Sequence, residues 1–237
     1  MVATITIWLT AGFGHASPGA SVEYQTMAPI GQYLSASADE EIVLARSAAP
    51  PSISKDAEVL VLGPGGYTIG VKGKNGFVCL VGRSWNAEFV NPAFWNPIVR
   101  GPDCLNPAAV RSMLPHYLER TKWALAGLSI PQMIERTKAE VAAKTYVLPE
   151  PGAMSFMMSK DQSLSNQGVH WHPHLMFFVA NTSDENFGAN FPGSPVLHPF
   201  PTEPDPIATF LVPVRRWSDG TIADVAPPSE SAAHHEH

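Results

Sequence analysis

The stretch VHWHPHLMFFVA, residues 169–180, alternates with a period of two and therefore predicts a β-strand. On one face of this strand, three of the chain's nine histidines are followed by two apolar residues: His170, His172, His174, Met176 and Phe178. The opposite face carries only apolar side chains: Val169, Trp171, Leu175, Phe177 and Val179. One face is apolar and the other starts with imidazoles, which indicates a metal or proton-transfer site on the surface of a sheet.

A zinc site is one interpretation of this run, with His170, His172 and His174 as ligands. Zinc takes three or four ligands, and a His-x-His pair on one strand face can supply two of them. His170 and His174 would lie about 13 Å apart on an extended strand, so their convergence needs a bend. Pro173 could provide that bend, or it could mark an edge strand. Completing ligands could come from five other residues: His116, Glu150, Asp161, Asp184 and His198.

Three other interpretations stay open. Copper(I) favours thioether ligands, and four methionines lie near the histidines, although methionine-rich strands are more often core: Met154, Met157, Met158 and Met176. The histidines could also be structural, with two of them bonded to neighbouring backbone and the third facing water. Finally, they could serve acid–base catalysis without a metal.

Composition limits the class of protein. The chain has 237 residues, 45% of them hydrophobic, which predicts one globular domain over residues 17–225 and a flexible tail at 226–237. The net charge is −6, and the 15 Lys and Arg residues form no dense run. This charge pattern argues against a nucleic-acid partner.

The first 16 residues are apolar and uncharged, and Gly14 and Ala16 precede a cleavage position after Ala16. This pattern predicts a signal peptide and a periplasmic or secreted protein, although no basic residue occurs before Arg46. A buried N-terminal strand is the alternative. The apolar run of roughly a dozen residues is shorter than the ~20 needed to cross a bilayer, so we expect no transmembrane span.

Cys79 and Cys104 are the only cysteines, and an even pair in an exported chain predicts a disulfide, here one that joins a loop to the sheet. In a reducing compartment, Cys79 would instead be a buried thiol. A Cys79 and His172 nucleophile pair is disfavoured, because the apolar run GFVCLVG would raise the pKa of the thiol.

The remaining patterns predict an α+β fold, an antiparallel sheet of about six strands packed by two to three helices. Strands are expected at 57–62, 67–71 and 77–81 as a meander, and at 153–158, 172–180 and 207–214. Helices are expected at 38–48, at 107–126 with a break at Pro115, and at 130–144. Asn106 should cap the second helix, and Ser129 with Gln132 should cap the third. Four prolines predict that 91–107 is a loop, with Phe94 and Trp95 inserted into the core.

Several segments together resemble a family of uncharacterised exported bacterial proteins, over residues 42–221. The segments that carry this resemblance are EIVLARSAAPPSIS, NGFVCLVGRSW, CLNPAAVRSMLPHYLERTKWALAG, EPGAMSFMMS, HWHPHLMFF, GANFPGSPV and WSDGT. The resemblance implies export and one domain, and it implies no activity.

Two functions follow from these patterns. The first is an exported protein with a histidine-rich site that holds a divalent metal and hydrolyses a substrate with metal-activated water. The second is a non-enzymatic periplasmic protein that binds a ligand or a partner and uses the histidines structurally. A third hypothesis, hydrolysis by a cysteine thiol, requires Cys79 to be free.

Overall fold

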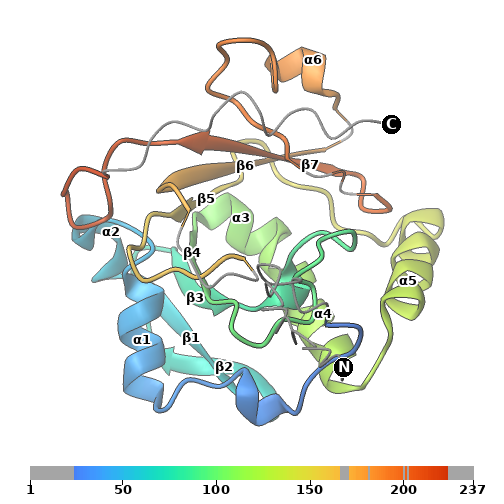
Figure 1. The fold of residues 1–237 in the computed structure, drawn as a ribbon, viewed down its shortest axis with the longest axis horizontal. Helices are drawn as coiled ribbons and strands as arrows, with labels where there is room; N and C mark the ends of the chain where they lie inside the picture. The colour runs from blue at the N-terminus through green and yellow to red at the C-terminus, as the bar shows by residue number, and fades with distance from the viewer. Residues whose placement is uncertain (1–23, 166–170, 181, 200, 202, 224–237) are drawn as a thin grey trace, which may run out of the picture.

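The computed structural model describes residues 24–165, 171–180, 182–199, 201 and 203–223 (Figure 1). The predicted signal peptide, the predicted tail and His170 lie outside this part of the chain. The strands are β1 (Glu58–Gly63), β2 (Gly66–Val71), β3 (Val78–Gly82), β4 (Gly101–Leu105), β5 (Met154–Met157), β6 (His174–Ala180) and β7 (Ile207–Pro213). The helices are α1 (Ala38–Arg46), α2 (Pro51–Ser54), α3 (Pro107–Ser112), α4 (Leu114–Leu125), α5 (Ile130–Ala142) and α6 (Asp184–Phe187), with short 3-10 turns at Ile30–Gln32 and Ser84–Asn86.

The strands form one sheet in the order β2-β1-β3-β4-β5-β6-β7. The α+β class is confirmed, but the sheet is mixed, because β1 and β3 are parallel while the other neighbours are antiparallel. The described residues also contain one more strand and more helices than the patterns predicted.

The expected meander of the first three strands is wrong, because β3 pairs with β1 instead of β2. The link from β2 to β3 crosses the start of β1. There, a Cβ atom on Gly73 would lie 2.1 Å from the backbone nitrogen of Glu58, so only glycine fits this crossing. Asn75 Nδ2 donates a hydrogen bond to the carbonyl of Ile53 (2.8 Å), which holds the link next to α2.

Strand β4 lies inside the proline-rich segment that was predicted to be a loop. All five of its residues are buried between β3 and β5. Proline interrupts a ladder where an N–H is required. Because β5 pairs only with Cys104 and Leu105, Pro102 falls where β4 has β3 as its one strand partner.

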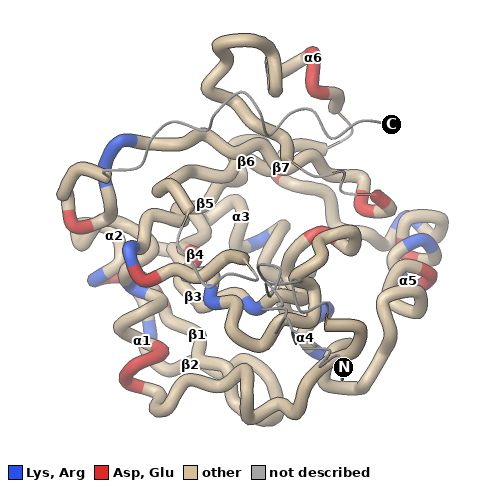
Figure 2. Tube along the Cα trace, viewed as in Figure 1, with Lys and Arg blue, Asp and Glu red and all other residues tan. Residues whose placement is uncertain are grey.

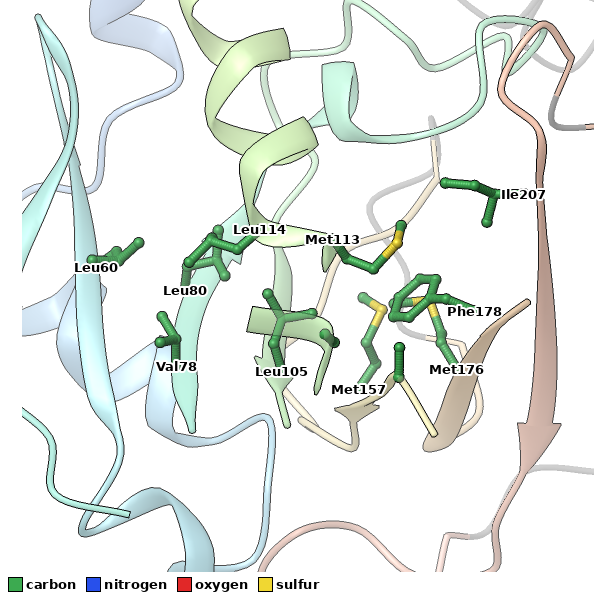
Figure 3. Close-up of a cluster of buried hydrophobic side chains, with 12 residues drawn as sticks. Leu60, Val78, Leu80, Leu105, Met113, Leu114, Met157, Met176, Phe178 and Ile207 are labelled. Atoms are coloured by element: carbon green, nitrogen blue, oxygen red, sulfur yellow. The ribbon is translucent and has the colours of Figure 1, made fainter. Parts of the chain in front are cut away.

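Both faces of the sheet are covered by helices. Small residues and the two cysteines pack under α1 on one face: Ala45, Ala48, Ala49, Ala57, Val59, Cys79, Val81 and Cys104. On the other face, α3 and α4 cover a larger cluster with Leu80, Leu105, Met113 and Phe178 (Figure 3). The predicted insertion of Phe94 and Trp95 is confirmed, because both are buried in a third cluster with Trp85 and Trp123.

Local signals place the helix ends as expected. The Asn106 side chain accepts a hydrogen bond from Ala109 N (2.9 Å), and Pro115 follows the break between α3 and α4. The Ser129 backbone donates to Gln132 Oε1 (2.9 Å) at the start of α5. In the part of the chain that the structure describes, the helices are too short or too polar to cross a bilayer.

A buried ion pair joins α1 to the end of β3. The Arg83 guanidinium donates to both carboxylate oxygens of Glu41 (2.9 and 2.8 Å), and the two side chains are 0% and 1% exposed. Arg83 also donates to the backbone carbonyls of Tyr33 (2.7 Å) and Val81. Other charges are spread over the chain with both signs interspersed, as on α5 (Figure 2).

Candidate functional site

The histidine segment does not form a polar surface in its described part. Strand β6 begins at His174 instead of His172, and His172 and His174 are only 8% and 2% exposed. The face of His174 is the covered one, because Met176 and Phe178 belong to the core beneath α3 and α4. The expectation of imidazoles on the surface of the sheet is therefore wrong for these two residues.

The two described histidines are held by their own backbone segment. The Nδ1 atom of His174 lies 2.7 Å from the carbonyl oxygen of His172, and the indole of Trp171 packs edge-on at 4.8 Å from the His174 ring. The buried Gln162 amide donates to the carbonyl of Trp171 (2.8 Å). Burial lowers the pKa of His174 to about 4, so its ring is neutral at pH 7 and donates a proton to that carbonyl.

The metal interpretation finds no complete ligand set among the described residues, where no three His, Cys, Asp or Glu side chains gather as a metal site. His170 lies outside them, so a metal site that includes His170 stays a prediction. Met157 and Met176 pack in the hydrophobic core.

Four of the five residues considered as completing ligands have other partners for their side chains. Glu150 pairs with Arg111 (2.6 Å), and His116 Nε2 bonds the carbonyl of Val147 (2.7 Å). His198 Nδ1 lies 2.6 Å from Asp184, so two of the five predicted residues meet each other instead of the histidine segment. The fifth, Asp161, is exposed, and the bond it makes to Ser159 Oγ (3.1 Å) is donated by its backbone N–H.

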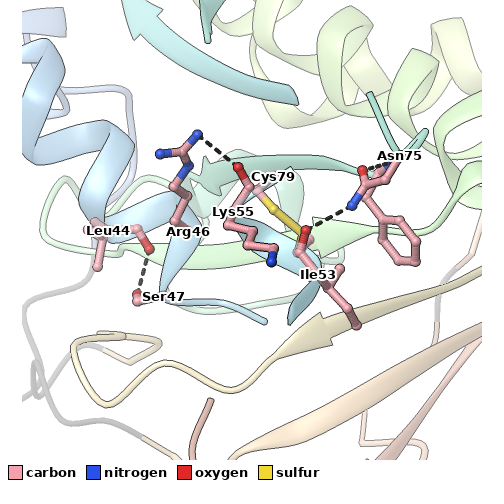
Figure 4. The surroundings of a disulfide bond; sticks show 9 residues. Leu44, Arg46, Ser47, Ile53, Lys55, Asn75 and Cys79 are labelled. Carbon is pink, nitrogen blue, oxygen red and sulfur yellow. Dashed lines mark hydrogen bonds between the residues drawn. A yellow bond between two sulfur atoms is a disulfide. The ribbon is translucent and has the colours of Figure 1, made fainter. Parts of the chain in front are cut away.

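The predicted disulfide between Cys79 and Cys104 is confirmed (Figure 4). The two residues face each other in the ladder between β3 and β4, so the bond joins adjacent strands, not a loop and the sheet. Because Cys79 is oxidised, the hypothesis of thiol-based hydrolysis is wrong. Beside the bond, the Ser47 hydroxyl donates to the carbonyl of Leu44 (2.6 Å), which closes the end of α1.

A polar pocket that the sequence patterns missed lies between α4 and α5. We call it the acid–aromatic pocket, and its cavity volume is about 10 Å³, which is room for about one water molecule. It is lined by His116, Glu119, Arg120, Trp123, Thr137, Glu140, Tyr146 and Asp205. The first four come from α4 and the next two from α5, while the last two come from segments outside these helices.

Hydrogen bonds and stacking fix the wall of this pocket. Arg120 pairs with Asp205, and its guanidinium also donates to the carbonyl of Ala87 (2.6 Å). The Tyr146 hydroxyl donates to the other oxygen of Asp205 (2.7 Å). The His116 ring stacks on Tyr146 with 4.2 Å between centroids. Arg120 and Tyr146 therefore hold Asp205 in one orientation.

The pocket has an excess of negative charge. Burial raises the pKa of Glu140, and the nearby carboxylates of Glu119 and Asp205 raise it further. Burial lowers the pKa of His116, which favours its neutral form. The indole of Trp123 is 6% exposed, and its Nε1–H is buried without an acceptor. A buried donor without an acceptor is uncommon in folded proteins.

Comparisons with known proteins add no relative: the chain matches no protein-family model, no curated protein and no solved structure.

Proposed function

We propose that the chain is an exported, non-enzymatic protein that binds a ligand or a partner at the surface around the acid–aromatic pocket. The observation that carries this proposal is the convergence of ionisable and aromatic side chains on one concave site between α4 and α5. Ligand sites combine a few oriented polar groups with apolar walls, and groups with shifted pKa values gather there.

The histidines take a structural role in this proposal. A neutral His174 that donates to the backbone two residues earlier satisfies a buried carbonyl and fixes the entry into β6. This is what the second of the two sequence-based functions requires.

Export is supported by the disulfide. Such bonds persist in oxidising compartments, and this one is buried between two strands. The apolar first 16 residues are in keeping with a signal peptide.

The test is a screen of small polar molecules by NMR on the ¹⁵N-labelled protein, with Trp123→Phe to assign the indole signal of Trp123. We expect at least one saturable shift of that signal. In parallel, elemental analysis compares the wild type with a His170→Ala/His172→Ala double variant. Stoichiometric zinc or copper that the double variant loses would favour the metal-dependent function over this one.

A further inference from the structure

We propose that Asn75, in the link between β2 and β3, is a site of spontaneous deamidation in the folded protein, and that the reaction frees this link from α2. The inference concerns a covalent modification and does not depend on the proposed binding function.

The first argument is the sequence. Asn75 is the one asparagine of the chain that a glycine follows. In deamidation, the backbone nitrogen of the next residue attacks the side-chain carbonyl carbon of the asparagine. A side chain on the next residue crowds this attack, and glycine has none. The pair Asn75–Gly76 is therefore the least hindered place in the chain for this reaction.

The second argument is the conformation of the link. The Asn75 Oδ1 atom accepts a hydrogen bond from the backbone N–H of Phe77 (3.1 Å), which closes an Asx-turn. This hydrogen-bonded ring contains both reacting atoms, the side-chain carbonyl carbon of Asn75 and the backbone nitrogen of Gly76. Because Gly76 has a φ of 80°, the turn also favours glycine at this position. Holding two reacting groups together lowers the entropic part of a barrier, so ring closure needs no unfolding here.

The third argument is access to the attacking nitrogen. Gly76 is exposed, and Asn75 is half-buried. Over the part of the chain that the structure describes, no backbone carbonyl or side chain accepts a hydrogen bond from the N–H of Gly76. Solvent can therefore take the proton that this nitrogen loses when it attacks.

The reaction balances with water as its one co-reactant. A bond forms between the nitrogen of Gly76 and the side-chain carbonyl carbon of Asn75. The bond from that carbon to Nδ2 breaks, and Nδ2 leaves as ammonia. Water then opens the cyclic imide at either of its carbonyls, which leaves an aspartate or an isoaspartate at this position.

The consequence follows from the partner that Nδ2 has before the reaction. It donates to the carbonyl of Ile53 (2.8 Å) and so holds the link next to α2 (Figure 4). A carboxylate has no proton to donate, so this bond is lost. The crossing at Gly73 keeps a separate bond, from the backbone N–H of Lys74 to the carbonyl of Asp56 (2.9 Å). Deamidation should therefore loosen α2 and leave the strand order intact.

The first experiment incubates the full chain in mildly alkaline buffer, folded or unfolded in guanidinium, and follows each asparagine by peptide mapping and mass spectrometry. We expect Asn75 in the folded chain to react at a rate within about tenfold of the unfolded rate, a difference of at most about 1.4 kcal/mol in the barrier. Asn86 is the internal control and should stay unmodified. Its Oδ1 also accepts a backbone N–H, from Arg83 (3.0 Å), but Ala87 follows it.

The second experiment compares Asn75→Asp, which reproduces one product, with Asn186→Asp. The control adds the same charge at an exposed site and also loses a side-chain donor, to Thr182 Oγ1 (3.2 Å). Hydrogen exchange at the amides of Ile53 and Ser54 in α2 should be roughly fivefold faster in Asn75→Asp, the factor expected for one lost hydrogen bond. Exchange in Asn186→Asp should match the wild type.

Two results would overturn the inference in different ways. A folded rate more than about tenfold below the unfolded rate would show that the fold shields Asn75, and the site would be refuted. Unchanged exchange in α2 of Asn75→Asp would refute the release of the link. Neither result bears on the binding function.

Discussion

The buried pair of Glu41 and Arg83 gives the sharpest prediction on stability. In Glu41→Gln, the fully buried guanidinium of Arg83 keeps its bonds to two carbonyls but loses the one carboxylate that the described residues pair with it. Removing one member of a buried pair costs about 3–5 kcal/mol. In a chain of this size, 1 kcal/mol corresponds to about 2–4 °C, so Tm should fall by roughly 6–20 °C.

The assay is thermal and urea unfolding followed by circular dichroism. Glu40→Gln is the control, because Glu40 is the exposed neighbour of Glu41 in the first turn of α1. Near a helix N-terminus, this loss of charge costs less than about 1 kcal/mol. The reasoning is refuted if the two variants differ by less than about 1 kcal/mol. A Glu41→Leu/Arg83→Met variant should recover much of the loss, since it leaves no unpaired charge.

Three further predictions concern pH and redox state. Burial lowers the pKa of His174 from 6.5 to about 4 on folding, so between these pH values the unfolded chain binds the extra proton. Wild-type stability should therefore drop by about 3 kcal/mol relative to His174→Gln as pH falls from 6.5 to 4, as urea unfolding at each pH would show. Burial raises the pKa of Asp103 from 3.8 to about 7, so its protonated folded form loses stability as pH rises through 7. The free energy of unfolding of Asp103→Asn relative to the wild type should thus be higher at about pH 8 than at about pH 4. An equal difference between the two proteins at both pH values would contradict this sign. A Cys79→Ala/Cys104→Ala variant opens a loop with a sequence separation of 25, and calorimetry should find a loss of about 3.5 kcal/mol.

Features that depend on local chemistry could be predicted from the sequence. The caps at Asn106 and Ser129 and the break before Pro115 each involve groups within three or four residues. Short β-rich runs between turn signals, together with the alternation in 169–180, also located six of the seven strands. The missed strand is β4, because a proline such as Pro102 excludes a strand only where a neighbouring strand needs its N–H, and that depends on where β5 ends. The pairing of β3 with β1 likewise depends on the crossing at Gly73, which no local pattern encodes.

The histidine run shows what alternation in a sequence can and cannot predict. It correctly places His174, Met176 and Phe178 on one face, but it does not say which face the helices cover. Three histidines in five residues look like a polar surface. Yet a single hydrogen bond to the carbonyl of His172 lets a neutral His174 lie in the core. The concentration of histidines in this segment was therefore a poor guide to whether their side chains are exposed.

Unlike the histidine segment, the acid–aromatic pocket is made of residues that do not lie together in the sequence. His116, Arg120 and Trp123 are four and three residues apart, so the helical repeat places them on one face of α4. Thr137 and Glu140 share a face of α5 by the same rule. Each half could have been proposed from the sequence as a mixed polar and aromatic face. Nothing local indicates that the two faces meet, or that Asp205, 59 residues beyond Tyr146, closes the gap by pairing with Arg120. Since a charged wall made in this way depends on that one ion pair, Asp205→Asn should disturb the indole signal of Trp123 even without ligand. An unchanged signal would mean that Arg120 holds its place through Ala87 and Phe89 alone.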